Sequence, residues 1–207
     1  MKPLLLLLLL HTAHICWAQP KITKLDKNNL PKKVQYTGHL INAVRWMDSL
    51  GSHIVLTTET GAIPSKTNKE EDYKEAALYA YHYMIIDDSI KLLWKVYDFV
   101  KECPLDIQAN YIKNTFAVTD LNKNGNAEVW LMYKTACRSD VSPANMKIVM
   151  YEGVKKHIAR GTNKVQVAEK SFTGGDYTFD AAFKSAPEAF KQYATQLWKK
   201  YSLETWD

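Results

Sequence analysis

The sequence predicts a mainly β protein, α+β at most, built as an antiparallel meander of about eight to ten short strands with one C-terminal amphipathic α-helix. Short segments rich in β-branched and aromatic residues recur along the chain, and turn-forming sequences separate them. Near the end of the chain the apolar spacing changes from that of a strand to that of a helix. Because the connections are short, neighbouring strands should pair antiparallel.

The strand-like segments fall into hairpins. The sequence Asp-Ser-Leu-Gly at 48–51 indicates the first turn, Asp-Asp-Ser at 87–89 the second, and Glu-Gly at 152–153 another. The predicted hairpins pair 40–47 with 53–60, 76–86 with 90–100, and 146–151 with 156–160. Further strands are expected at 116–119, 127–135 and 165–172.

The predicted helix spans residues 185–202. Ser185 and Glu188 have the spacing of a capping box, and Pro187 lies where a first-turn proline is tolerated. Such a helix could dock a partner or pack on the open face of the sheet, and we favour packing. Its apolar side chains share one face: Phe190, Tyr193, Ala194, Leu197, Trp198 and Tyr201.

The N-terminal residues 1–18 have the pattern of a cleavable secretory signal peptide. Lys2 precedes a leucine run at 4–10, and the small residue Ala18 precedes Gln19. That run would span only about 10 Å as a helix, too short for a bilayer core of roughly 30 Å, which disfavours the alternative of an uncleaved anchor. No later stretch is apolar enough for a transmembrane segment, so we expect an exported protein in the periplasm or at the cell surface.

The exported part divides into two regions. Residues 19–35 are polar and lysine-rich, which predicts a flexible lead-in, and 36–207 should form a single β-rich domain with the helix included. The chain carries 27 Lys and Arg against 22 Asp and Glu, and these charges are interspersed. An interspersed pattern lacks the basic patch of a nucleic-acid-binding protein, so we expect no nucleic-acid partner.

The cysteines predict one disulfide. Cys16 lies within the signal, which leaves Cys103 and Cys137 as an even pair in an exported chain. A redox pair is the alternative, but the chain has no Cys-x-x-Cys motif. We therefore expect a structural bridge.

A loop between two predicted strands has calcium-type spacing. Gly125 occupies position 6, where such a loop turns sharply, and the flanking strands together with Leu131 at position 12 exclude an EF-hand. The alternative is a plain type I′ turn at Asn124-Gly125. We predict Ca²⁺ ligands at positions 1, 3, 5, 7 and 9, where the residues are Asp120, Asn122, Asn124, Asn126 (through its carbonyl) and Glu128.

Other candidate sites are weaker. Arg138 and Asp140 could bind an anionic or sugar ligand through charge-assisted hydrogen bonds, or pair with each other or cap backbone. The histidines are scattered, and His82 is expected to be a packed residue. Most tryptophans should lie in the core, although some could form a platform for sugars. The acid runs at 70–72 and 87–88 are sequence neighbours, whereas a glycosidase needs two carboxyls opposed across a cleft.

Several motifs together resemble a known family. They are Trp46-x-Asp48-x-x-Gly51-x-His53-Ile54, Ala80-Tyr81-His82-Tyr83, the block from Thr119 to Glu128, and Tyr133-Lys134 through Cys137 to Pro143. They are similar to a family of small exported Bacteroidetes proteins labelled "surface polysaccharide biosynthesis protein", over about residues 36–165. The loop itself resembles the short calcium loops of FG-GAP repeats, with two of the aspartates replaced by asparagine.

The resemblance implies an envelope protein connected with the production of surface polysaccharide or lipopolysaccharide, and it supplies no catalytic residues. We therefore expect a non-catalytic role: an accessory protein that supports polysaccharide assembly or binds glycan, with cell-surface polysaccharide or envelope proteins as partners. The alternatives are a polysaccharide-modifying hydrolase with a carboxylate pair and a structural component of the envelope.

Overall fold

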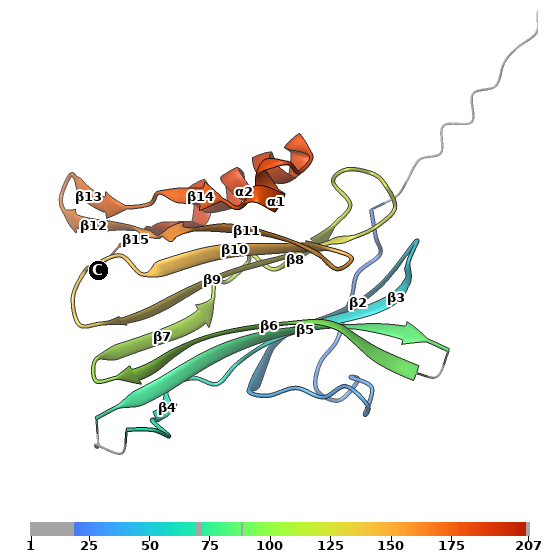
Figure 1. Cartoon of the computed structure of the whole chain (residues 1–207), viewed down its shortest axis with the longest axis horizontal. Coiled ribbons are helices and arrows are strands. Elements are labelled where there is room, and N and C mark those ends of the chain that lie inside the picture. Colours follow the sequence, from blue (N-terminus) through green and yellow to red (C-terminus); the bar gives the residue numbers. More distant parts are fainter. Residues whose placement is uncertain (1–18, 69–71, 88, 206–207) are drawn as a thin grey trace, which may run out of the picture.

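The computed structural model describes residues 19–68, 72–87 and 89–205, and it confirms the mainly β fold with a C-terminal helix. The predicted signal peptide, Trp206, and residues 70, 71 and 88 of the acid runs lie outside the described residues. Two six-stranded sheets lie one above the other, with a helical layer above the upper sheet (Figure 1). Sheet A contains β1 (Thr23–Lys24), β2 (His39–Asp48), β3 (Gly51–Glu59), β4 (Ile63–Pro64), β5 (Lys74–Ile86) and β6 (Ser89–Cys103).

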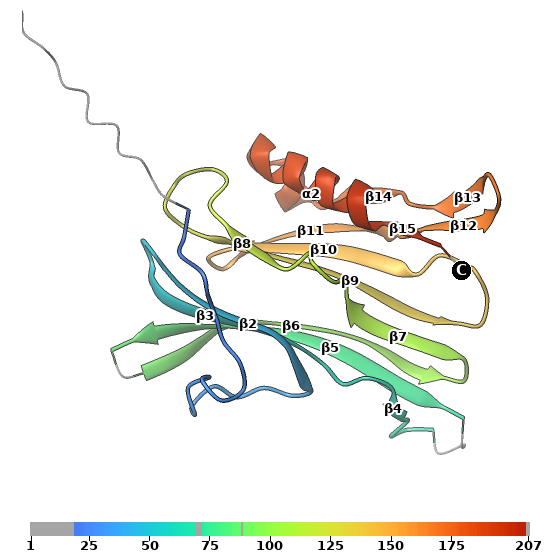
Figure 2. The same cartoon turned by 180° about the vertical axis from the view of Figure 1, so that it is seen from behind.

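Sheet B lies between sheet A and the helices, and its pairs are antiparallel. It contains β7 (Asp106–Tyr111), β8 (Ala117–Thr119), β9 (Glu128–Arg138), β10 (Asn145–Glu152), β11 (Lys155–Thr162) and β14 (Tyr177–Phe179). A small sheet C combines β12 (Lys164–Ala168), β13 (Ser171–Gly174) and β15 (Leu203–Glu204), and its β12–β15 pair is parallel. The view from behind shows β7 at the edge of sheet B, between β9 and sheet A (Figure 2).

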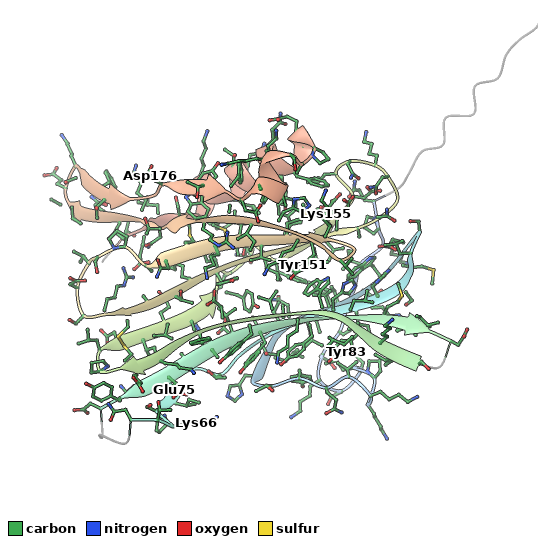
Figure 3. All side chains as sticks on the ribbon, viewed as in Figure 1. Lys66, Glu75, Tyr83, Tyr151, Lys155 and Asp176 are labelled. Carbon is green, nitrogen blue, oxygen red and sulfur yellow. A yellow bond between two sulfur atoms is a disulfide. The ribbon has the colours of Figure 1, made fainter. Side chains whose placement is uncertain are left out.

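Strand alternation builds the core between the sheets. On β5 the side chains of Ala76, Leu78 and Ala80 point inward, and on β9 those of Val129 and Leu131 meet them. Trp94 stacks on Tyr151 with ring centres 4.1 Å apart, and Figure 3 places Tyr151 between the sheets. Burying each large apolar side chain contributes about 1.5–3 kcal/mol, so this interface is a main source of stability.

The opposite face of sheet B is covered by α1 (Ala181–Lys184) and α2 (Glu188–Tyr201). Trp130 and Met132 of β9 pack there against Phe190 and Trp198 of α2. This confirms that the amphipathic helix packs on the sheet, as its single apolar face predicts.

The sequence prediction differs from the structure at the start of the helix. The helix begins at Glu188 after the N-cap residue Pro187, which makes no side-chain capping bond. Ser185 instead ends α1, where its hydroxyl donates to the carbonyls of Ala181 and Ala182, so the predicted capping box was wrong. The first turn, α1, was missed because its four residues are too few to show a helical period.

Two further segments differ from expectation. The single strand predicted at 165–172 is a hairpin of β12 and β13, with the turn at 169–170 between them. The segment 19–35, for which we expected a flexible lead-in, lies against sheet A. There β1 pairs with β2, and Leu25, Leu30 and Val34 pack on Ile54 and Leu56 of the outer face. Apolar residues spaced irregularly among lysines gave no periodic signal for this packing.

A disulfide joins the two large sheets. Cys103 ends β6 in sheet A, Cys137 lies near the end of β9 in sheet B, and their Cα atoms are 5.6 Å apart. This confirms the predicted bridge. The bridge lies where the chain passes from sheet A to sheet B.

Candidate functional site

The calcium-type loop connects β8 to β9 and closes on its own hydrogen bonds. The buried Asp120 carboxylate accepts the amide N–H of Asn124 on Oδ1 and that of Gly125 on Oδ2, both at 3.1 Å. Lys123 and Gly125 have φ values of 57° and 82°, a left-handed conformation that glycine adopts without strain. The sharp turn expected at Gly125 is therefore present.

Glu128 closes the base of this loop. Its carboxylate accepts the Thr119 hydroxyl at 2.7 Å and the Leu121 amide at 2.9 Å, and the residue has no exposed surface. Burial raises the pKa of Glu128 to about 7, with nearby Asp120 and Glu152 acting in the same direction and the two hydrogen bonds opposing it. Three carboxylates thus lie within electrostatic range of one another.

The asparagine side chains use their amide groups differently from a metal cage. Asn122 and Asn124 both donate Nδ2–H to Oε1 of Glu152 at 2.7 Å, and Asn126 Oδ1 accepts the Ser49 hydroxyl. Within the described ranges no group of three or more His, Cys, Asp or Glu side chains is arranged to hold a metal ion. The loop is held by its own hydrogen bonds as a self-capped turn, and calcium binding stays a prediction.

Calcium binding is tested by thermal unfolding. If the five predicted ligands bind Ca²⁺, a concentration 100-fold above Kd stabilises the fold by about 2.7 kcal/mol, which raises Tm by roughly 5–10 °C. The measurement compares Tm in calcium chloride, in magnesium chloride and in a chelator. Asn122→Ala, which removes one ligand, should reduce the calcium shift, and an identical wild-type Tm in all three buffers would contradict the prediction.

A buried polar network that the sequence did not suggest lies beside this loop. His53 Nε2 is 3.0 Å from Asp48 Oδ1, and His53 Nδ1 is 2.9 Å from Nε2 of His82. Asp48 also accepts the Trp46 indole N–H at 2.9 Å and the Ala127 amide at 3.1 Å. The carboxylate of Asp48 therefore ties the β2–β3 hairpin to the loop before β9.

The hydrogen bonds assign the histidine tautomers. The ionised Asp48 accepts from His53 Nε2–H, and His53 Nδ1 is assigned as the acceptor of His82 Nε2–H. His82 Nδ1 is then a lone pair with no hydrogen-bond partner among the described residues. Burial, with His53 adding to it, lowers the pKa of His82 to about 3, which keeps the ring neutral. As expected, His82 is a packed residue, stacked on Trp46 and edge-on to Trp94.

Asp48 and Asp120 both line a hollow of about 220 Å³. A hydrolase would need one of these carboxyls to act as an acid and the other as a base or nucleophile. Here Asp48 accepts N–H groups of Trp46, Leu50 and Ala127, and Asp120 accepts those of Asn124 and Gly125. Through these hydrogen bonds both carboxylates hold the loops together.

The other predicted ligand-binding pair, Arg138 and Asp140, lines a hollow of about 440 Å³ at the end of β9. Arg138 Nη2 is 2.6 Å from the Glu204 carboxylate, and Arg138 also donates to the Ser142 carbonyl. Asp140 accepts the amide and the hydroxyl of Ser142. Asp140 therefore caps backbone, as the alternative proposed, while Arg138 pairs with Glu204 from the end of the chain, and ligand binding here stays a prediction.

Sequence reasoning missed an aromatic strip on the outer face of sheet A. We use this name for Tyr79 of β5 with Tyr97 and Phe99 of β6. Tyr79 and Tyr97 are cross-strand partners with ring centres 5.0 Å apart, and Phe99 lies 5.0 Å beyond Tyr97. Tyr97 is 49% and Phe99 42% exposed. The alternation of Tyr97 and Phe99 with inward residues was the available signal, but we expected tryptophans, and the four within the described chain are buried.

No family model, curated protein or solved structure matches the chain when it is compared with them. The resemblance to the exported Bacteroidetes family therefore stays a prediction. In the described part of the chain no helix has the length and apolar character needed to cross a membrane.

Proposed function

We propose that this protein is an exported accessory protein of surface polysaccharide assembly that binds glycan on the aromatic strip. The single observation that carries the glycan site is the exposure of Tyr97 and Phe99, stacked in line with Tyr79, on the outer face of sheet A. Exposed aromatic rings that are grouped on a sheet indicate an interaction surface, whereas exposed apolar residues that are scattered singly do not.

The chemistry of the strip suits a sugar chain. A sugar ring has a C–H face that packs on aromatic carbon and hydroxyls at its rim that need hydrogen-bond partners. The tyrosines supply both ring surface and phenol hydroxyls. Lys95 adds a donor, since its ammonium lies 4.9 Å from the Tyr79 ring centre and 5.3 Å from that of Tyr81.

The rest of the outer face explains why the strip remains open. The segment from Leu25 to Tyr36 covers Tyr81 and Tyr83, and Tyr83 donates its hydroxyl to the Gln35 carbonyl. Figure 3 shows Tyr83 on this outer side of sheet A, away from sheet B. That cover does not extend over Tyr97 and Phe99, which belong to none of the buried clusters among the described residues. The strip is therefore the uncovered continuation of an aromatic face.

The test is glycan binding by paired variants. Tyr97→Ala with Phe99→Ala should weaken binding by about 30-fold or more, the effect of losing a central aromatic contact. Binding is measured on a glycan array and then by calorimetry with the envelope polysaccharide of the source cells. Tm should change little, because both side chains are half exposed.

Phe172→Ala provides the matched control, since Phe172 is 44% exposed but lies on sheet C. This variant should bind as the wild type does. A deletion strain should show altered surface polysaccharide. A wild-type protein that binds no glycan, together with unchanged polysaccharide in the deletion strain, would remove the proposal, and release of reducing ends would favour the hydrolase instead.

A further inference from the structure

A groove beside the aromatic strip carries an unbalanced positive charge. It has a volume of about 340 Å³ and runs between the edge of β6 and the inner face of sheet B. In the described chain β6 pairs with β5 alone, so its other edge forms one wall of the groove. We name it the basic groove; its charged residues are Lys95 and Asp98 of β6 with Lys147, Lys156 and Arg160 of sheet B.

The strand register places the cations of sheet B on one face. Lys147 of β10 lies opposite Arg160 of β11, and Lys156 lies two positions before Ile158, whose side chain joins the core between the sheets. Positions with this alternation would be apolar if sheet A covered them. They carry charge beside the unpaired lateral edge of β6, so the floor of the groove is an exposed extension of the sandwich interior.

Apart from Lys95, whose ammonium lies over the rings of the aromatic strip, the groove contains three cations and one carboxylate. Asp98 already has two partners, because its Oδ2 lies 2.5 Å from Lys147 Nζ and accepts the Tyr133 hydroxyl at 3.1 Å. Among the described residues neither Lys156 nor Arg160 forms an ion pair. Partial burial lowers the pKa of Lys156, and the charges of Arg160 and Lys147 lower it further. Asp98 and Asp180 oppose this effect only in part, and cations in excess of their counter-charges are stabilised by a bound anion.

The groove and the strip adjoin. Lys95 and Tyr97 line the groove, and the Lys95 ammonium also lies over the Tyr79 and Tyr97 rings, 4.9 Å and 6.0 Å from their centres. A ligand that packs on Tyr97 can therefore extend over the edge of β6 toward Lys156 and Arg160.

We propose that the basic groove binds the carboxylate or phosphate group of an acidic sugar in the glycan held by the aromatic strip. This inference rests on the proposed function and adds the class of ligand: an anionic polysaccharide. Lys156 and Arg160 provide charge-assisted hydrogen bonds to the anion, and the strip packs on the neighbouring sugar rings. Lys147 remains paired with Asp98 and adds to the positive field.

The experiment measures the affinity of three probes of equal length by calorimetry at low salt. The probes are a galacturonate oligomer, a phosphorylated mannose oligomer and a neutral dextran oligomer. The wild type should bind at least one acidic probe about tenfold more tightly than dextran, and the affinities for the carboxylate and phosphate probes show which anion is recognised. Lys156→Gln with Arg160→Gln should reduce that affinity to the dextran level and flatten its salt dependence.

A charge-matched control is Lys155→Gln with Lys199→Gln, two exposed lysines outside the groove. It should retain the preference for the acidic probe. If the Lys156/Arg160 variant binds the acidic probes as the wild type does, the inference is overturned. If that happens while Tyr97→Ala with Phe99→Ala loses all probes, the proposed function stands without it. If only the Lys156/Arg160 variant loses the acidic probes, anion binding in the basic groove is supported and glycan binding on the aromatic strip is overturned. If the wild type binds none of the three probes, both proposals are overturned.

Discussion

Replacing Cys103 and Cys137 together by alanine should lower the free energy of unfolding by about 4 kcal/mol. The bridge closes a loop with a sequence separation of 34, and the chain-entropy cost of opening such a loop in the unfolded state gives this magnitude. The bridge also joins β6 to β9 across the two sheets, so its loss frees the chain where it crosses between them. Urea unfolding of the variant and of the wild type measures the difference.

Two controls separate the bridge from the side chains. Adding a reducing agent to the wild type should cause most of the same loss, and it should leave the double variant unchanged. Each single alanine variant should lose about as much as the double, because either change removes the whole bond. A loss below about 1 kcal/mol would mean that this bond does not constrain the unfolded chain as the loop-closure argument requires.

Asp48→Ala should be the most damaging single substitution near the loop, with a loss of about 3–5 kcal/mol. It removes the acceptor for Trp46 Nε1–H and the Ala127 amide, and it leaves the buried His53 ring without its charged partner. Buried donors without partners each cost about 1–3 kcal/mol. Asp48→Asn should lose less, since it retains one acceptor oxygen.

The matched control is Asp26→Ala, because Asp26 also accepts two main-chain amides, from Asn28 and Asn29, in an exposed turn. It should lose about 1 kcal/mol or less, as an exposed cap does. Equal losses for Asp26→Ala and Asp48→Ala would contradict the role assigned to the buried network.

The same network predicts an acid-dependent stability. Burial alone would raise the pKa of Asp48, but hydrogen bonds from His53, Trp46, Ala127 and Leu50 outweigh it and hold the pKa well below 3.8. Because the pKa is lowered on folding, ionised Asp48 contributes its full stabilisation at a pH above its pKa in the unfolded chain. This stabilisation is lost as the pH falls below that value. The difference in the free energy of unfolding between wild type and Asp48→Ala should therefore be largest at pH 7. It should decrease as the pH falls below about 4.

Local patterns were sufficient for most of the strands. Residues 40–47, 76–86 and 146–151 alternate or cluster β-branched and aromatic side chains, and each lies within an observed strand. The turn chemistry also placed the hairpins, since the Asp-Ser-Leu-Gly, Asp-Asp-Ser and Glu-Gly sequences each separate two such runs. The predicted disulfide needed only the parity of the cysteines in a chain that the sequence predicts to be exported. The short elements β7 and α1 gave too little pattern to detect.

The candidate sites were harder to predict, because alternation does not show which face of a strand is covered. Tyr97 and Phe99 have the same sequence pattern as buried aromatics, and only the end of the N-terminal cover leaves them exposed. Lys156 and Arg160 resemble ordinary surface lysine and arginine until the register places them beside the edge of β6. The contact between Asp48 and Ala127 joins residues 79 apart, which no local pattern encodes.

The sequence by itself determined where the strands and the last helix form, which cysteines pair, and that the Asp120–Glu128 segment turns sharply at Gly125. These properties depend on neighbouring residues and on the period of the chain. The tertiary structure alone decided how the strands divide into two sheets, and which aromatic and cationic side chains remain open to a ligand. Exposure depends on what packs against a residue from distant parts of the chain, so the aromatic strip and the basic groove emerge only when the sheets are stacked.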